Sequence, residues 1–189
     1  MFDHAETTIP QPQLDHNGDA AAITGTTALA EIFLSVPPSE RIRMSIADLE
    51  VAEGSADYSI DMDTWHAPDH RTGTCAVCMA GAVLASRHPI RPHQIYVGPF
   101  DAEGPDEFST TAAWDRIFTG LDELRHGYVD AFLLEDGRVT DAQVEAFVAR
   151  FGPADPREPF PGHVAYDADP AAFKAWALTV ADKLAEIGL

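Results

Sequence analysis

The sequence predicts a mainly helical α+β fold, in which a short strand or small sheet packs on a central helix that contains both cysteines. Apolar residues recur with the helical period along several segments, whereas an alternating pattern of period two occupies one short segment. The chain has 189 residues, of which 46% are hydrophobic. A chain of this size can bury a core without a metal or a disulfide. We therefore expect a single globular domain over residues 26–189.

The first part of the chain differs from the rest in composition. Residues 1–25 are rich in Thr, Ala, Pro, Gln, Asp and Gly and have no period that could bury one face. We predict that they form a mobile acidic arm. A short apolar helix is expected at 27–36, where two prolines then stop it. Ser39 is a suitable N-cap for a further helix that extends to about Glu53.

Both cysteines lie in the segment 58–89. Apolar and polar side chains alternate at its start, which is typical of a half-buried strand, and Trp65 ends this pattern. Residues 66–73 are polar and predict a loop. A helix is expected over 75–87, because both cysteines and several apolar residues recur there at helical spacing. This pattern places the two sulfur atoms on one face of a buried helix.

The second half of the chain is predicted to be helical after a short strand at 94–97 and an acidic loop. An apolar stripe predicts a helix over 111–125, and a shorter helix is expected at 128–134. Thr140 and Gln143 form a capping-box signature before the next helix. A proline-rich linker follows, and Asp169 and Pro170 then begin the last helix. The apolar stripe of that helix predicts that it docks on the domain.

The chain is strongly acidic, with 31 Asp and Glu residues against 12 Lys and Arg and a net charge of −19. This charge argues against direct binding to a phosphate backbone. It is compatible with three roles: solubility, docking on a basic protein, or imitation of nucleic acid. No apolar run is long enough to cross a bilayer, and the N-terminus lacks the pattern of a signal peptide. We therefore predict a cytoplasmic protein that does not associate with membranes.

Four residues have a spacing that suggests a metal site. His66, His70, Cys75 and Cys78 follow the pattern H-x3-H-x4-C-x2-C, and His and Cys are the ligands that zinc prefers. A small structural zinc site is therefore one prediction. The alternative is that the cysteines are small buried apolar residues and that the histidines belong to a surface loop.

The cysteines also suggest thiol chemistry. A C-x-x-C pair near a helix N-terminus can cycle between dithiol and disulfide, and either Cys75 or Cys78 would then be the reactive thiol. No alternating strand and helix pattern of the thioredoxin kind surrounds the pair.

A local resemblance suggests a hydrolase. Residues 73–80 resemble the Gly-x-Cys-x-x-Cys-x-Ala segment around the papain-family nucleophile. This resemblance implies that Cys78 is the nucleophile and that a distant histidine is its base, for which His163 is the best placed. Two features of that family are absent. Thr72 occupies the place of the oxyanion-hole glutamine. The asparagine that orients the catalytic histidine is also missing, because Asn17, the single asparagine of the chain, lies far upstream.

A wider resemblance covers residues 58–134. Trp65 is followed by a polar loop and by Cys75-x-Val77-Cys78-x-Ala80-Gly81-x-Val83-x-Ala85, and a second block reads Leu121-x-x-Leu124-Arg125-x-Gly127-x-Val129. Together these blocks resemble a family of small uncharacterised proteins encoded by tailed phages and prophages. The resemblance implies an accessory protein of phage or mobile-element origin in the host cytoplasm.

Two classes of function follow. The favoured one is a non-catalytic accessory protein that binds another protein, with an inhibitor that imitates nucleic acid as a special case. The charge and the absence of a recognisable catalytic set support it. The alternative is an enzyme, either a hydrolase or a redox protein, that uses Cys78 or Cys75. The sequence leaves the oligomeric state open.

Overall fold

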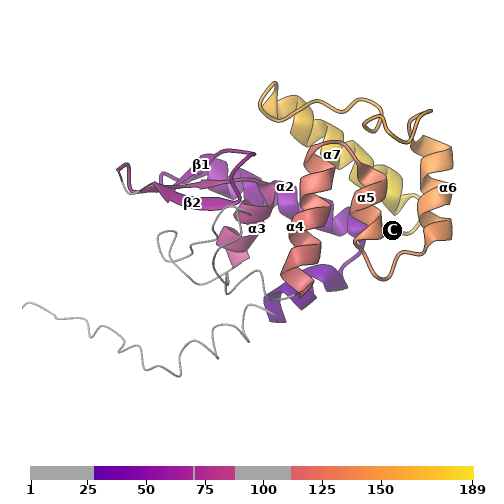
Figure 1. The fold of residues 1–189 in the computed structure, drawn as a ribbon, viewed down its shortest axis with the longest axis horizontal. Helices are drawn as coiled ribbons and strands as arrows, with labels where there is room; N and C mark the ends of the chain where they lie inside the picture. The colour runs from indigo at the N-terminus through magenta and orange to yellow at the C-terminus, as the bar shows by residue number, and fades with distance from the viewer. Residues whose placement is uncertain (1–27, 70, 88–111) are drawn as a thin grey trace, which may run out of the picture.

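A computed structural model describes residues 28–69, 71–87 and 112–189. Within these ranges the protein is a bundle of helices with one small three-stranded sheet, and the predicted fold class is confirmed (Figure 1). The predicted arm at 1–25 and the predicted strand at 94–97 lie outside the described residues. None of the helices in these ranges has the length and apolar character needed to cross a membrane.

Helix α2 (Pro38–Gly54) lies at the centre of the bundle, where it packs against α3 (Met79–Arg87) and α7 (Pro170–Ala185). Residues 28–35 are helical, as the sequence predicts. The predicted N-cap of α2 is wrong. Pro37 occupies that position without a side-chain hydrogen bond, and Ser39 is buried in the first turn. Proline suits the start of a helix because its φ angle is already helical.

The sheet has the strand order β1, β3, β2. Strand β1 (Tyr58–Ile60) is parallel to β3 (Thr74–Val77), and β2 (His66–Asp69) is antiparallel to it. Gly73, immediately before β3, has a φ angle of 73°, which glycine adopts without steric cost. Figure 1 shows the sheet projecting from the helical part of the molecule.

The cysteine segment differs from its prediction. Cys75 lies in β3 and Cys78 lies between β3 and α3. The helix that is expected to contain both cysteines, α3, therefore contains neither. Burial alternates along Thr74–Val77, and this period of two is the mark of a strand. The same residues also fit a helical spacing, because the segment is short. The predicted polar loop at 66–73 is likewise wrong at its start, where β2 forms.

The later helices agree with their predictions. They are α4 (Ala112–Arg125), α5 (Val129–Leu134), α6 (Asp141–Phe151) and α7. The capping box of α6 is confirmed, since Thr140 accepts a hydrogen bond from the backbone of Gln143 and the Gln143 side chain bonds the Thr140 amide. Asp169 caps α7 through the amides of its first turn. The apolar stripe of α7 is buried on α2, which confirms the predicted docking.

The backbone before β2 lies close against α3 at Gly81. A Cβ atom at Gly81 would lie 1.6 Å from the carbonyl oxygen of Trp65. The same carbonyl accepts a hydrogen bond of 3.4 Å from the amide of Cys78. The ring of Trp65 lies 4.2 Å from that of Phe118 between centroids, which brings α4 against this corner. Trp65, Cys78 and Gly81 therefore share one packing arrangement.

Candidate functional site: the buried cysteines

The structure brings one predicted pair of site residues together. Val77 stands opposite His66 in the register of β2 and β3, so Cys75 is a diagonal neighbour of His66 on the same face of the sheet. The Cys75 sulfur lies 3.2 Å from Nδ1 and 3.4 Å from Nε2 of His66. Both residues are buried, with 0% of Cys75 and 1% of His66 exposed.

These two distances define the kind of contact. A hydrogen bond in the plane of an imidazole points at one nitrogen and leaves the other much farther away. A sulfur almost equidistant from both nitrogens at this range must lie over the face of the ring. The contact between Cys75 and His66 is therefore a thiol packed on an aromatic face. A nucleophile and its base need the in-plane arrangement instead.

The electrostatics of Cys75 agree with this description. Burial raises the pKa of its thiol from 9.0 to about 11. Reactive cysteines have a lowered pKa and access to solvent, because the thiolate is the nucleophile. Cys75 has neither property and stays a protonated thiol at neutral pH.

Cys78 has a different structural role. It lies at the start of α3, where the backbone amides of Ala80 and Gly81 hydrogen-bond its sulfur. Burial raises the pKa of the Cys78 thiol and outweighs these amides and the charge of Arg125, which act in the opposite direction. Only 3% of Cys78 is exposed. Its sulfur therefore satisfies amides at the first turn of a helix, in place of the usual serine or aspartate.

His163, the predicted base, is held elsewhere. Its Nε2 atom donates a hydrogen bond of 2.9 Å to the carbonyl oxygen of Arg125 at the end of α4. Its ring centroid lies 4.7 Å from that of Trp176 on α7. In the part of the chain that the structure describes, no hydrogen bond joins His163 to either cysteine. The arrangement holds the segment before α7 against α4, which is a packing role.

Of the four predicted zinc ligands, the structure pairs His66 with Cys75. His70 lies outside the described residues. Among the residues that are described, no group of three or more His, Cys, Asp or Glu side chains could hold a metal ion. The four-ligand zinc site stays a prediction from spacing.

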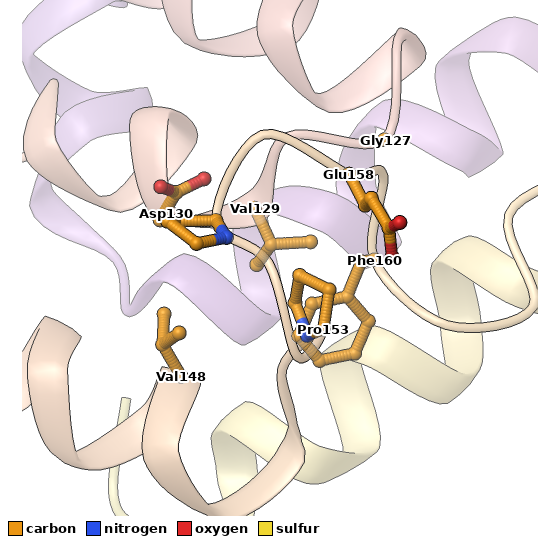
Figure 2. Close-up of a pocket in the computed structure, with 8 residues that line it drawn as sticks. Gly127, Val129, Asp130, Val148, Pro153, Glu158 and Phe160 are labelled. Carbon is orange, nitrogen blue, oxygen red and sulfur yellow. The ribbon is translucent and has the colours of Figure 1, made fainter.

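A small hollow lies between α5, α6 and the segment after α6 (Figure 2). Its volume is about 10 Å³, which is about the space of one water molecule. Figure 2 shows Asp130 and Glu158 on opposite sides of it, so these carboxylates do not converge on a common point. Ligand pockets are far larger, of the order of hundreds of Å³. The hollow is too small to hold an organic substrate.

Comparison of the chain with protein-family models, with curated proteins and with solved structures gives no match.

The predicted zinc site places His66 near Cys75, but the sequence does not predict that the two residues meet across a pair of strands. The sequence of β2 is His-Ala-Pro-Asp, which has little strand propensity and reads as a loop. One signal could have found it. Gly73 lies directly before Thr74–Val77, a run that begins and ends with β-branched residues, and this is compatible with a hairpin that would place the preceding residues beside Cys75.

Proposed function

We propose that this protein is a non-catalytic accessory protein that acts by binding another protein through its carboxylates. The arrangement of charge carries this proposal. Within the described residues, most cationic side chains are already paired with carboxylates of the same chain. These pairs involve Arg41, Arg43, Arg87, Arg125, Arg138, Arg150, Arg157 and Lys174.

Two of the remaining cationic side chains contact aromatic rings or a backbone carbonyl instead. Lys183 lies over the rings of Phe151 and Phe160, and Arg116 donates to the carbonyl oxygen of Glu135. A further set of carboxylates is exposed and has no ion pair in the described part of the chain. This set includes Glu31, Asp57, Asp61, Asp115, Glu145 and Asp167. An acidic surface whose own cations are occupied is suited to attract a basic partner.

The burial of both thiols also supports a non-catalytic role. A thiol enzyme requires an accessible thiolate, and the pKa of each cysteine is raised here. An inhibitor that imitates nucleic acid is a special case of the proposal, in which the basic partner is a nucleic-acid-binding protein. The phage or mobile-element origin is a further part of the proposal, and it rests on the resemblance of residues 58–134.

Two variants of equal net charge test the proposal. The first replaces the six unpaired carboxylates named above by amides. The control replaces six carboxylates that already have an arginine partner, namely Glu40, Asp63, Asp122, Asp155, Asp182 and Glu186. Each variant changes the net charge from −19 to −13, because six negative charges are removed.

The experiment first crosslinks the tagged protein to its partner in cells and then measures the affinity for that partner in purified form. The first variant should bind about tenfold or more weakly, and the control should lose much less, because its carboxylates are already engaged. A double Cys75→Ala and Cys78→Ala variant that folds should bind normally. Equal losses in the two charge variants would contradict the proposal. DNA that competes for the partner would identify the nucleic-acid mimic.

A further inference from the structure

The small sheet has two edges, and they differ in how they are protected. β2 forms one edge and contains Pro68, which has no amide hydrogen to offer a further strand. β1 forms the other edge and has the sequence Tyr-Ser-Ile, with no proline. Proline and charge on an edge are common means by which proteins prevent unwanted strand pairing.

The hydrogen bonds of β1 show which of its main-chain groups face outward. The amide of Cys75 donates to the carbonyl of Asp57 at 2.8 Å, and the amide of Asp61 donates to the carbonyl of Val77 at 3.0 Å. Main-chain groups of alternate residues point to opposite sides of a strand. Residues 57, 59 and 61 therefore face β3, and Tyr58 and Ile60 direct their amide and carbonyl groups away from the sheet.

These outward groups are not used within the described part of the chain. Apart from bonds within the sheet, no backbone hydrogen bond involves Tyr58 or Ile60 there. Ser59 between them is exposed, as are Asp57 and Asp61 on either side. In Figure 1 the sheet projects from the helical part of the molecule.

We infer that the β1 edge is the docking site for an extended, basic segment of the partner protein, which adds to the sheet as a further strand. This inference rests on the proposed function, since it names the part of the acidic protein that holds the partner. Strand addition is a common mode of peptide recognition, in which main-chain hydrogen bonds supply affinity and side chains supply specificity.

The charges beside β1 select a basic occupant. Asp57 and Asp61 have no ion pair among the described residues, whereas Asp63 nearby is paired with Arg125 at 3.3 Å. The Asp61 carboxylate accepts hydrogen bonds from the Asp63 amide and the Thr64 hydroxyl, so its negative charge is not neutralised by a cation. A partner strand with Arg or Lys side chains near Asp57 and Asp61 gains favourable cross-strand pairs. A second copy of this chain would instead bring like charges together at the same edge, which opposes pairing between copies.

A short synthetic peptide in which Arg and Val alternate is the probe. Its affinity is measured by fluorescence anisotropy, together with hydrogen exchange of the Tyr58 and Ile60 amides. The peptide should slow exchange at both amides. A fully N-methylated peptide of the same charge should bind about tenfold or more weakly, because it cannot donate main-chain hydrogen bonds. Equal binding of the two peptides, or no binding of the first, would overturn the inference.

Variants of β1 provide the matching test on the protein. Ile60→Pro removes an outward amide that β3 does not use, so the sheet should persist while peptide binding falls about tenfold or more. Ile60→Val keeps that amide and should bind like the wild type. Asp57→Asn with Asp61→Asn should weaken binding about three- to tenfold. If wild-type protein forms dimers that Ile60→Pro abolishes, a second copy occupies the edge and the inference is wrong.

The purified partner separates this inference from the proposed function. If Ile60→Pro binds the partner normally while the variant without the six unpaired carboxylates does not, strand addition is wrong and the proposed function stands. If both variants lose binding to the partner, strand addition and the proposed function both stand. If neither variant loses binding, strand addition and the proposed function are both wrong.

Discussion

Replacement of Gly81 by alanine tests the packing of the cysteine segment most severely. The new Cβ atom would lie 1.6 Å from the carbonyl oxygen and 2.8 Å from the carbonyl carbon of Trp65. Comfortable contact requires roughly 3.5 Å, so α3 and the Trp65 backbone must separate by roughly 2 Å. Both neighbours are backbone atoms, so no flexible side chain can move aside.

The cost of this separation can be bounded. Overpacking of a core costs typically about 1–3 kcal/mol, and displacement of backbone places this site at or above the upper end. Alanine recovers about 1 kcal/mol through its better helix propensity. We therefore expect Gly81→Ala to lower the free energy of unfolding by about 2–4 kcal/mol, and the melting temperature by about 4–16 °C.

Urea denaturation followed by circular dichroism measures this change. Gly54→Ala is the matched control, because Gly54 also lies in a helix and a Cβ atom there would meet nothing within 4 Å. That variant should be neutral or slightly stabilised. A Gly81→Ala protein whose unfolding free energy lies within about 0.5 kcal/mol of the wild type would refute the packing described for α3 and Trp65.

Three further predictions concern other contacts. Burial raises the pKa of Cys75 from 9.0 to about 11, so its contribution to stability is complete below pH 9 and is lost as the pH rises toward 11. Wild type should lose about 3 kcal/mol more than Cys75→Ala over this range, as measured by urea titrations. Arg41→Met removes the buried partner of the Asp136 carboxylate, which then keeps only its contacts with Arg138, and should cost about 3 kcal/mol at pH 7; a normal melting curve would contradict this. Thr140→Ala removes the cap of α6 and should cost about 1 kcal/mol in denaturant melts, whereas Thr140→Ser should retain stability.

The helices that the sequence predicts well have signals that act locally. The capping pair at Thr140 and Gln143 and the start at Asp169 fix the ends of α6 and α7 through side chains adjacent in sequence. The apolar stripes of α4 and α7 are long enough to separate helical from strand periodicity. These sequence signals do not depend on which other elements the helices pack against.

The cysteine segment was mispredicted because its structure depends on distant pairing. The run from Thr74 to Val77 has only four residues, and their spacing fits a helix and a strand equally well. Hydrogen bonds to β1 and β2 decide between the two, and β2 itself has a sequence typical of a loop. The packing of Cys75 on the His66 ring follows from that strand pairing, which the zinc-ligand spacing alone does not predict.

The motif from Cys75 to Gly81 has a physical explanation in this fold. Cys75 and Val77 are buried from β3, Cys78 satisfies amides of α3, and Gly81 permits contact with the Trp65 backbone. Each of these positions demands a small or apolar residue for packing. The pattern therefore has a structural reason in this chain, independent of any reaction.

Alkylation of the native protein by iodoacetamide, followed by mass spectrometry, tests the central claim that Cys75 and Cys78 are structural. At pH 8 a thiol of pKa about 11 has about a hundredfold less thiolate than one of pKa 9.0, and burial slows the reagent further. We predict that neither cysteine is modified during the time in which both react completely in denaturant. Rapid modification of either one in the folded protein would contradict the account and restore the thiol-enzyme alternative.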